Sequence, residues 1–169
     1  MQQPTRHEIT AAMVNSSRSR IKAMTFPEGF DDTPWDDLDF YGWIDPRAPQ
    51  RAYLVTAYRD RLVGVEFRVA HADPTRSRGV MCTLCRSSRR NADATLFTAG
   101  KAGAAGKAGN SVGTYLCADF ACSLYVRNLK TLPDPQPERS LPTEVRIENL
   151  RGRLDGFLAR VLGDAPSRG

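Results

Sequence analysis

The chain has 169 residues, of which 41% are apolar, and it carries a net charge of +5 with an isoelectric point of 9.3. This length and apolar content favour one globular domain, or one domain with an extension, over a disordered chain. The N-terminus is polar and no apolar stretch approaches the roughly 20 residues of a membrane span, so we expect a cytoplasmic protein without a membrane anchor. The basic balance favours an anionic partner, either nucleic acid or an acidic protein face, although ordinary solvation of the charges explains it equally well.

A helix start signal opens residues 1–27. Thr5 stands three residues before Glu8, which is the spacing of a capping box. Apolar residues then recur at roughly helical spacing until Pro27, at Ile9, Met13, Ile21 and Met24. The pattern predicts an N-terminal helix in this segment.

The next stretch is both acidic and aromatic. Residues 28–45 contain seven acids and no base, and the sequence W-D-D-L-D-F-Y-G-W runs from Trp35 to Trp43. The apolar positions follow no single period, so we expect a short irregular segment whose aromatic side chains dock on the core. A protein-binding patch is the alternative.

Two segments with strand character follow. Residues 52–58 are rich in strand formers, and apolar and polar side chains alternate over residues 62–69. Residues 59–61 are suited to a turn. The pattern predicts a β-hairpin that leads into the cysteine-rich part of the chain.

All four cysteines fall into two pairs, Cys82 with Cys85 and Cys117 with Cys122. Two residues separate the first pair, so one tight turn can aim both thiolates at one point. Four residues separate the second pair, so both fit the opening turn of a helix over residues 117–128. Four thiolates that converge on one point form a tetrahedral zinc site. The order of knuckle, hairpin and helix predicts a treble-clef zinc finger with one structural zinc ion.

Two other interpretations of the cysteines exist. Two disulfides, or four unrelated thiols, fit the spacing, but paired cysteines in the cytoplasm more often bind metal. His71 is an alternative ligand close to the first pair, although four cysteines already complete the site.

A second hairpin is predicted between the cysteine pairs, with strands over residues 94–98 and 112–116. The glycine-rich residues 100–109 between them resemble a phosphate-binding loop only superficially. No glycine stands five positions before Gly106, and Lys107 is followed by alanine instead of serine or threonine. We expect a mobile loop at the tip of the hairpin.

The C-terminal part begins with a stiff linker, because residues 132–142 contain four prolines. Residues 143–162 then predict a helix with an apolar stripe, formed by Ile147, Leu150, Leu154, Phe157, Leu158 and Val161. We expect this helix to pack back on the domain, and partner binding is the alternative. The predicted fold is therefore α+β, with the zinc-finger domain and its acidic lead-in at residues 28–131 between an N-terminal helix and a C-terminal helix.

Catalysis is not favoured by the residue content. The two histidines, His7 and His71, stand in separate contexts, and no nucleophile–base pair can be assigned. A zinc ion held by four thiolates has no open position at which to activate water. We therefore expect a binding protein rather than an enzyme, and a monomer.

These motifs resemble a known family. The run G-N-S-V-G-T-Y-L-C-A-D-F-A-C-S-L-Y-V-R over residues 109–127, M-C-T-L-C over residues 81–85, and the acidic aromatic segment from Trp35 are similar to the C-terminal treble-clef zinc-finger domain of the elongation factor G-binding proteins. That family includes the fusidic acid resistance proteins, which release elongation factor G from stalled ribosomes. The resemblance implies a structural zinc on Cys82, Cys85, Cys117 and Cys122, and elongation factor G as the partner. The resistance proteins carry a substantial helical N-terminal domain where this chain predicts one helix, so drug resistance does not follow from the resemblance.

Position beside the zinc site, rather than the resemblance, suggests which residues meet the partner. Phe97 and Tyr115 are candidate aromatic anchors. Four basic side chains are candidates for steering towards an acidic face, namely Lys101, Lys107, Arg89 and Arg90. The alternative function is a ribosome- or RNA-binding zinc finger that acts through the same Arg/Lys patch.

Overall fold

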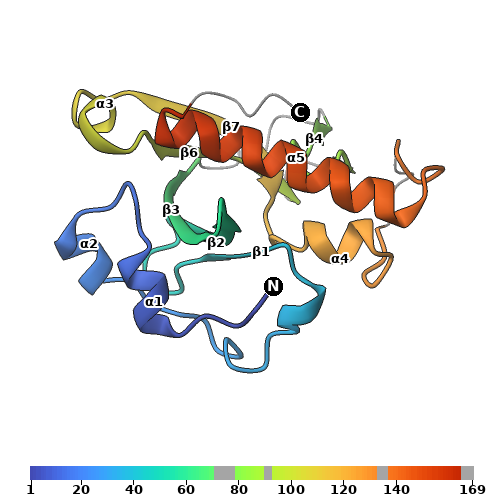
Figure 1. The fold of residues 1–169 in the computed structure, drawn as a ribbon, viewed down its shortest axis with the longest axis horizontal. Helices are drawn as coiled ribbons and strands as arrows, with labels where there is room; N and C mark the ends of the chain where they lie inside the picture. Colours follow the sequence, from blue (N-terminus) through green and yellow to red (C-terminus); the bar gives the residue numbers. More distant parts are fainter. Residues whose placement is uncertain (71–78, 90–92, 133–136, 165–169) are drawn as a thin grey trace.

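Five strands form one antiparallel sheet in the order β1-β2-β3-β6-β7 (Figure 1). The computed structural model describes residues 1–70, 79–89, 93–132 and 137–164, so His71 and Arg90 lie outside the described residues. The strands are β1 (Phe40–Ile44), β2 (Arg51–Tyr58), β3 (Arg61–Val69), β6 (Ala94–Gly100) and β7 (Ser111–Cys117). Both predicted hairpins are therefore confirmed, and they lie side by side because β3 pairs with β6.

The turn between β2 and β3 is a tight two-residue connection. Arg59 and Asp60 both have positive φ angles, of 47° and 62°. Two consecutive left-handed residues match the right-handed twist of the flanking strands, which is the geometry of a type I′ hairpin. The turn predicted at residues 59–61 is confirmed.

The acidic aromatic segment is more regular than its sequence indicates. It forms a short 3-10 helix, η1 (Trp35–Asp37), and then the edge strand β1. Phe40 packs into the core on one face of the sheet, and Trp43 packs into the core on the other. Because both faces of β1 are covered, its sequence lacks the alternation that marks a half-exposed strand. The docking of its aromatic residues on the core is confirmed, and the expectation of an irregular segment is wrong.

Two short helices replace the predicted N-terminal helix, α1 (Arg6–Ala11) and α2 (Arg18–Lys22). The capping box of Thr5 and Glu8 is present at the start of α1. The helix ends where the backbone turns to bond to β3, because Gly64 donates to the carbonyl of Ala12 and accepts from the amide of Val14. Ser17 then caps α2. These tertiary bonds interrupt an apolar spacing that alone suggests one helix.

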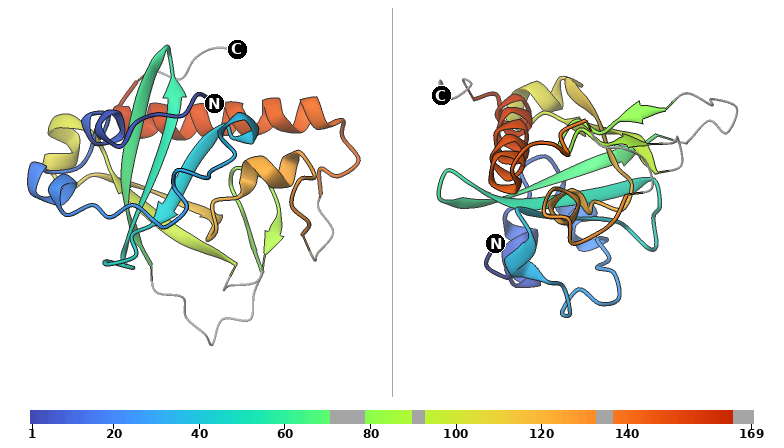
Figure 2. Two further views of the ribbon diagram at one scale, coloured as in Figure 1. Left: turned by 90° about the horizontal axis from the view of Figure 1, so that it is seen from below. Right: turned by 90° about the vertical axis from the view of Figure 1, so that its right-hand side faces the viewer.

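The sheet separates two hydrophobic cores. Figure 2 shows the N-terminal helices on one side of the sheet and α5 on the other. The N-terminal segment covers one face of the sheet with Ile9, Phe30 and Trp35. The other face carries α5 (Thr143–Leu162), whose Leu150, Leu154 and Phe157 share a core with the four cysteines. The C-terminal helix therefore packs back on the domain as predicted. None of the described helices is long and apolar enough to cross a membrane.

The tip of the second hairpin is folded. Residues 100–109 contain the short helix α3 (Gly103–Lys107). A side chain at Gly106 would place its Cβ atom 1.7 Å from the carbonyl oxygen of Lys101, so the backbone closes tightly on itself there. The loop lies at the hairpin tip as predicted, but it forms a helical turn.

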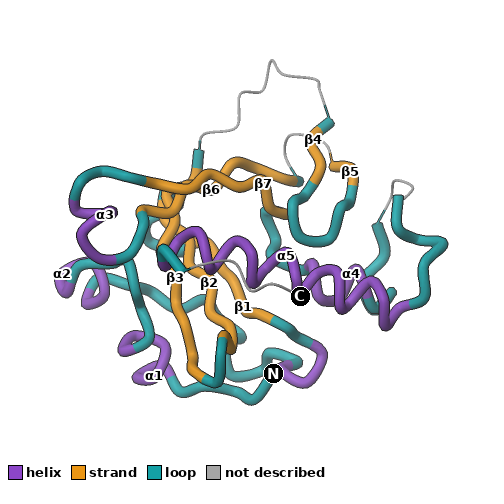
Figure 3. The backbone as a smooth tube through the Cα atoms, turned by 45° about the horizontal axis from the view of Figure 1, so that its top comes forward, coloured by secondary structure: helices purple, strands orange, loops and turns teal. Residues whose placement is uncertain are grey.

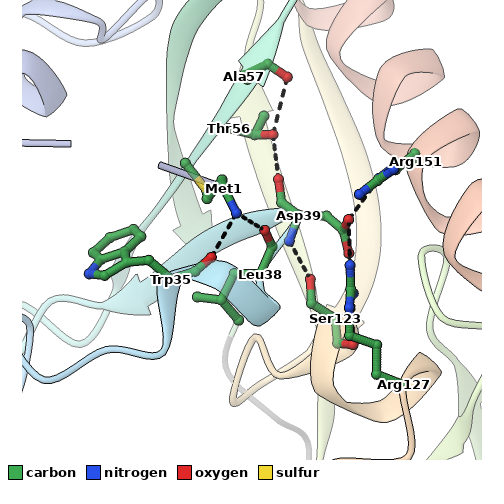
Figure 4. A network of polar contacts seen from close by, with 9 residues as sticks. All are labelled: Met1, Trp35, Leu38, Asp39, Thr56, Ala57, Ser123, Arg127 and Arg151. Atoms are coloured by element: carbon green, nitrogen blue, oxygen red, sulfur yellow. Dashed lines mark hydrogen bonds and ion pairs between the residues drawn. The ribbon is translucent and has the colours of Figure 1, made fainter. Parts of the chain in front are cut away.

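A buried carboxylate joins three parts of the fold (Figure 4). Asp39, just before β1, accepts hydrogen bonds from Arg127 at 2.6 and 3.0 Å and from Arg151 on α5 at 2.8 Å. Its backbone N–H donates to the Ser123 hydroxyl at 3.0 Å, and its carbonyl accepts from Thr56 at 2.8 Å. The contacts tie the acidic lead-in to the helix that carries the fourth cysteine and to α5.

Candidate metal centre

The four cysteine sulfurs meet at one buried point between the second hairpin and α5. All four ligand atoms lie within 4.8 Å of one another. The Sγ atoms of Cys82 and Cys122 are 3.6 Å apart, and those of Cys85 and Cys117 are also 3.6 Å apart. None of the four forms a disulfide. The predicted convergence of the two pairs is therefore confirmed.

The first pair lies in a knuckle between the short strands β4 (Val80–Met81) and β5 (Ser88–Arg89), which Figure 3 shows beside β7. The amide of Arg86 bonds to the carbonyl of Cys82 at 3.0 Å, and Arg86 itself has a positive φ angle of 58°. This tight turn brings Cys82 and Cys85, three apart in the sequence, to the same side of the turn, as the C-x-x-C spacing predicts.

Two contacts fix the knuckle to the rest of the fold. The amide of Thr83 donates to the carbonyl of Tyr115 on β7 at 2.8 Å. Arg153 on α5 donates to the carbonyl of Leu84 at 2.9 Å, and it is paired with Glu138. Glu138, in the segment predicted to be a linker, therefore helps to hold the knuckle in place through Arg153.

The second pair is arranged differently from the prediction. Cys117 ends strand β7, and Cys122 begins helix α4 (Cys122–Val126), so the pair spans a strand end and a helix start. Phe120 between them has a positive φ angle of 53°, which turns the chain sharply. The predicted helix over residues 117–128 is therefore reduced to its central part. The longer C-x-x-x-x-C spacing reflects this turn.

The residues present fit a tetrahedral zinc ion. A Zn–S bond of about 2.3 Å in tetrahedral geometry places the sulfurs about 3.8 Å apart, close to the two observed separations. Three of the sulfur-bearing residues, Cys82, Cys117 and Cys122, have no exposed surface, and Cys85 is 6% exposed. When bound, the ion supplies a fixed crosslink between the knuckle, the hairpin and α4. The site holds one structural zinc ion, as the sequence predicts.

The pKa values of the thiols also favour a bound metal cation. Hydrogen bonds from Cys117 and Cys122 lower the pKa of Cys82 well below its usual value. Contacts with Cys117, Cys82 and Cys85, together with burial, raise the pKa of the wholly buried Cys122. The protein groups alone therefore favour ionisation of only part of the cluster, and a dication compensates the charge when all four are thiolates.

Ser87 supports one of the thiolates. Its side chain is buried, and its Oγ atom lies 2.8 Å from the Sγ atom of Cys85. A hydroxyl that donates to a metal-bound thiolate orients the ligand and disperses its charge. No motif in the sequence distinguishes Ser87 from the neighbouring Ser88.

We expect Ser87→Ala to weaken zinc binding by about 10-fold to 100-fold, the usual effect of losing a supporting contact to a metal ligand. Competition with a chromogenic chelator measures the affinity. The matched control is Ser88→Ala, which removes the exposed hydroxyl of the next residue. Equal affinities in the two variants would show that the Ser87 hydroxyl does not support the thiolate.

A buried arginine lies beside the cluster. Arg89 is 8% exposed, and it donates to the Tyr125 hydroxyl at 3.3 Å. The Tyr125 hydroxyl in turn donates to Asp119, which is also paired with Lys130. Burial lowers the pKa of Arg89, but the charge of Cys117 and the Tyr125 contacts outweigh it and raise the pKa overall. Arg89 is therefore a local counter-charge to the thiolates.

The six candidate partner-binding residues have different positions. Tyr115 is 40% exposed on β7, next to the knuckle. Lys107 is exposed and Lys101 half-buried, both at the tip of the second hairpin. Phe97 has no exposed surface and packs against Phe67 and Phe120, so it is a core residue and not an anchor. Arg89 faces the metal centre and is not free for steering, and Arg90 lies outside the described residues.

A knuckle, a hairpin and a helix that together hold four thiolates define a treble-clef zinc-finger protein. The family described as "FBP C-terminal treble-clef zinc-finger" matches this chain over residues 8–161, and the chain belongs to that family. The match includes most of α1 and nearly all of α5, so the family's domain comprises both cores and extends beyond the finger. A search of curated proteins and a search of solved structures found no significant match.

Proposed function

We propose that this protein binds translation elongation factor G and promotes its release from the ribosome. The observation that carries the proposal is membership of the zinc-finger family over residues 8–161, together with the resemblance of residues 81–85 and 109–127 to elongation factor G-binding proteins. Under this proposal the protein acts in the cytoplasm, where elongation factor G and the ribosome work. A four-thiolate site has no coordination position for a substrate, which supports a binding role over an enzymatic one.

The surface we assign to this partner lies on β7 and the knuckle. Tyr115 and Met81 are two large apolar side chains exposed there, at 40% and 43%. Strands β4 and β7 contact each other, and the zinc-held knuckle bonds to the backbone of Tyr115. A rigidly held aromatic side chain loses little entropy on binding, which is typical of an interface anchor. Lys101 and Lys107 lie on the same hairpin and supply positive charge for an acidic face.

We expect Tyr115→Ala to weaken binding to elongation factor G by about 30-fold, which corresponds to a hot-spot loss of about 2 kcal/mol. Calorimetric titration of the zinc-loaded protein into elongation factor G measures the affinity. Val145→Ala serves as control, because it truncates a side chain that is 38% exposed on α5. Absence of saturable binding by the unaltered protein would contradict the proposed function. Equal affinities of the two variants would contradict only the assigned surface.

A further inference from the structure

A basic cleft lies away from the metal centre. It has a volume of 930 Å³ and is bounded by the residues around α2, the adjoining ends of β2 and β3, and the tip of the second hairpin. Its charged lining consists of five cations and one carboxylate among the described residues, a net charge of +4, from Arg20, Arg51, Arg68, Lys101, Lys107 and Glu66. Neither Arg51 nor Arg68 belongs to the Arg/Lys patch that the sequence suggested.

Two arginines stand side by side on neighbouring strands in the lining of this cleft. Arg51 on β2 pairs directly with Arg68 on β3 in the antiparallel register. Side chains in such a pair have Cβ atoms about 5 Å apart, and like charges there destabilise a sheet. Within the described residues, neither arginine forms an ion pair with a carboxylate. An anion bound between the two guanidinium groups would convert this repulsion into two charge-assisted contacts.

The wall of the cleft is held rigidly. The side-chain amide of Asn15 donates to the carbonyls of Glu66 and Gly100, both at 2.9 Å, and its oxygen accepts from the Glu66 amide at 2.8 Å. Ser16 donates to the Glu66 carboxylate, and Arg20 pairs with that carboxylate at 3.3 Å. The Glu66 carboxylate, the one acidic group of the described lining, is therefore hydrogen-bonded by Ser16, and its charge is offset by Arg20.

The two lysines are held by the hairpin tip. The amide of Lys101 bonds to the carbonyl of Asn110 at 2.9 Å, and the next amide, of Ala102, bonds to the carbonyl of Val161 on α5 at 2.8 Å. Lys107 ends α3. The tip is thus anchored to the sheet and to α5, and both of its lysines line the cleft together with the two arginines.

Tyr115 extends this surface with an aromatic ring. Arg68 pairs with Thr98 on β6. Leu96, two residues from Thr98 on the same strand, pairs with Tyr115 on β7, so Arg68 and Tyr115 lie on the same face of the sheet. Strand spacing and rise place their Cα atoms about 12 Å apart. A cationic groove with an exposed aromatic side chain nearby on the same face of the sheet is the arrangement that binds single-stranded nucleic acid, with phosphates in the groove and a base stacked on the ring.

We propose that the cleft binds the phosphate groups of single-stranded nucleic acid, with Arg51 and Arg68 as the principal phosphate contacts. The cleft is a second site, and it does not depend on the proposed function at β7. It shares only the two lysines and Tyr115 with the surface assigned to elongation factor G. Variants confined to Arg51 and Arg68 therefore test this site separately.

The test is fluorescence anisotropy of a labelled oligouridylate titrated with the zinc-loaded full chain. We expect Arg51→Gln/Arg68→Gln to bind at least roughly 10-fold more weakly than the unaltered protein. Measured between about 50 and about 200 mM salt, the slope of log affinity against log salt should fall by about 1.4, for two phosphate contacts to a single strand. The matched control is Arg61→Gln/Arg139→Gln, which removes the same charge from two exposed arginines outside the cleft.

Each other outcome overturns the site. An equal loss in the control variant would show that net charge alone attracts the oligonucleotide. Absence of binding by the unaltered protein at low salt would show that the protein does not bind single-stranded nucleic acid. Displacement of the oligonucleotide by a polyglutamate peptide of equal charge at equal concentration would identify a docking site for acidic protein segments instead. The melting temperature of the double variant should be unchanged or higher, because the substitution removes a like-charge pair, so a failure to fold is detected directly.

Discussion

Removal of zinc is expected to abolish the cooperative fold of the core beneath α5. A structural zinc site contributes about 10–16 kcal/mol of apparent binding free energy. A whole domain is stable by only about 5–15 kcal/mol. The cysteines belong to the same core as Leu154 and Phe157 of α5, so the loss extends well beyond the knuckle. The metal-free chain then has no net stability left on this side of the sheet.

Chelation followed by circular dichroism and thermal melting measures this effect. We expect the near-ultraviolet signal and the cooperative melting transition to disappear, and to return with Zn²⁺ but not with Mg²⁺, which prefers oxygen ligands. Cys122→Ser should behave like the chelated protein, since it removes a wholly buried ligand. Unchanged spectra and melting in a sample shown by elemental analysis to be free of metal would refute the structural role of the ion.

Local signals in the sequence sufficed for much of the fold. The C-x-x-C pair specifies a tight turn, and the alternation over residues 62–69 specifies a strand, because each depends on neighbours in sequence. The stripe of α5 likewise reports one buried helix face, and its bounds of Thr143–Leu162 agree with the predicted residues 143–162. The zinc ligands were predictable because thiolate chemistry and spacing together leave few alternatives.

The predictions that failed, and the cleft that the sequence did not suggest, depend on how segments pack against one another in three dimensions. Phe97 alternates correctly along its strand, but which face of β6 is buried depends on α5, so its sequence does not separate anchor from core. Arg89 stands among the basic residues Arg86 and Arg90 in the sequence, yet it is buried because the thiolates and Tyr125 offer it partners. The pairing of Arg51 with Arg68 follows from the hairpin register, and the cleft appears only when the tip of the second hairpin is placed beside them.

Asp39→Asn is expected to destabilise the protein by about 3–5 kcal/mol, the usual cost of breaking a buried ion pair on one side. The Asp39 side chain is 2% exposed, and the Arg127 side chain is 14% exposed, so the variant leaves a largely buried guanidinium without its counter-charge. Arg151 contributes less, because its side chain is 62% exposed and solvent screens its charge. The loss should separate the acidic lead-in from α4 and α5 without removing a zinc ligand.

The pKa of Asp39 gives the pH dependence of this effect. Burial raises the pKa, but the hydrogen bonds and charges of Arg127 and Arg151 outweigh burial and lower it overall. A carboxyl group whose pKa is lower in the folded than in the unfolded state stabilises the fold fully above its unfolded value, about 4, and this contribution is lost as the pH falls through the folded value. Urea unfolding of the zinc-loaded protein should therefore show a full difference between Asp39→Asn and the unaltered protein at neutral pH. The difference should narrow below about pH 4.

Asp36→Asn provides the comparison, because Asp36 is exposed and lies in the same acidic segment. It should change the free energy of unfolding by less than about 0.5 kcal/mol, as surface substitutions generally do. If Asp39→Asn were no more destabilising than Asp36→Asn at neutral pH, the buried carboxylate would not be what joins the lead-in to the zinc-bearing helix. The hydrogen bonds of the Asp39 backbone to Ser123 and Thr56, which the asparagine variant retains, would then be sufficient.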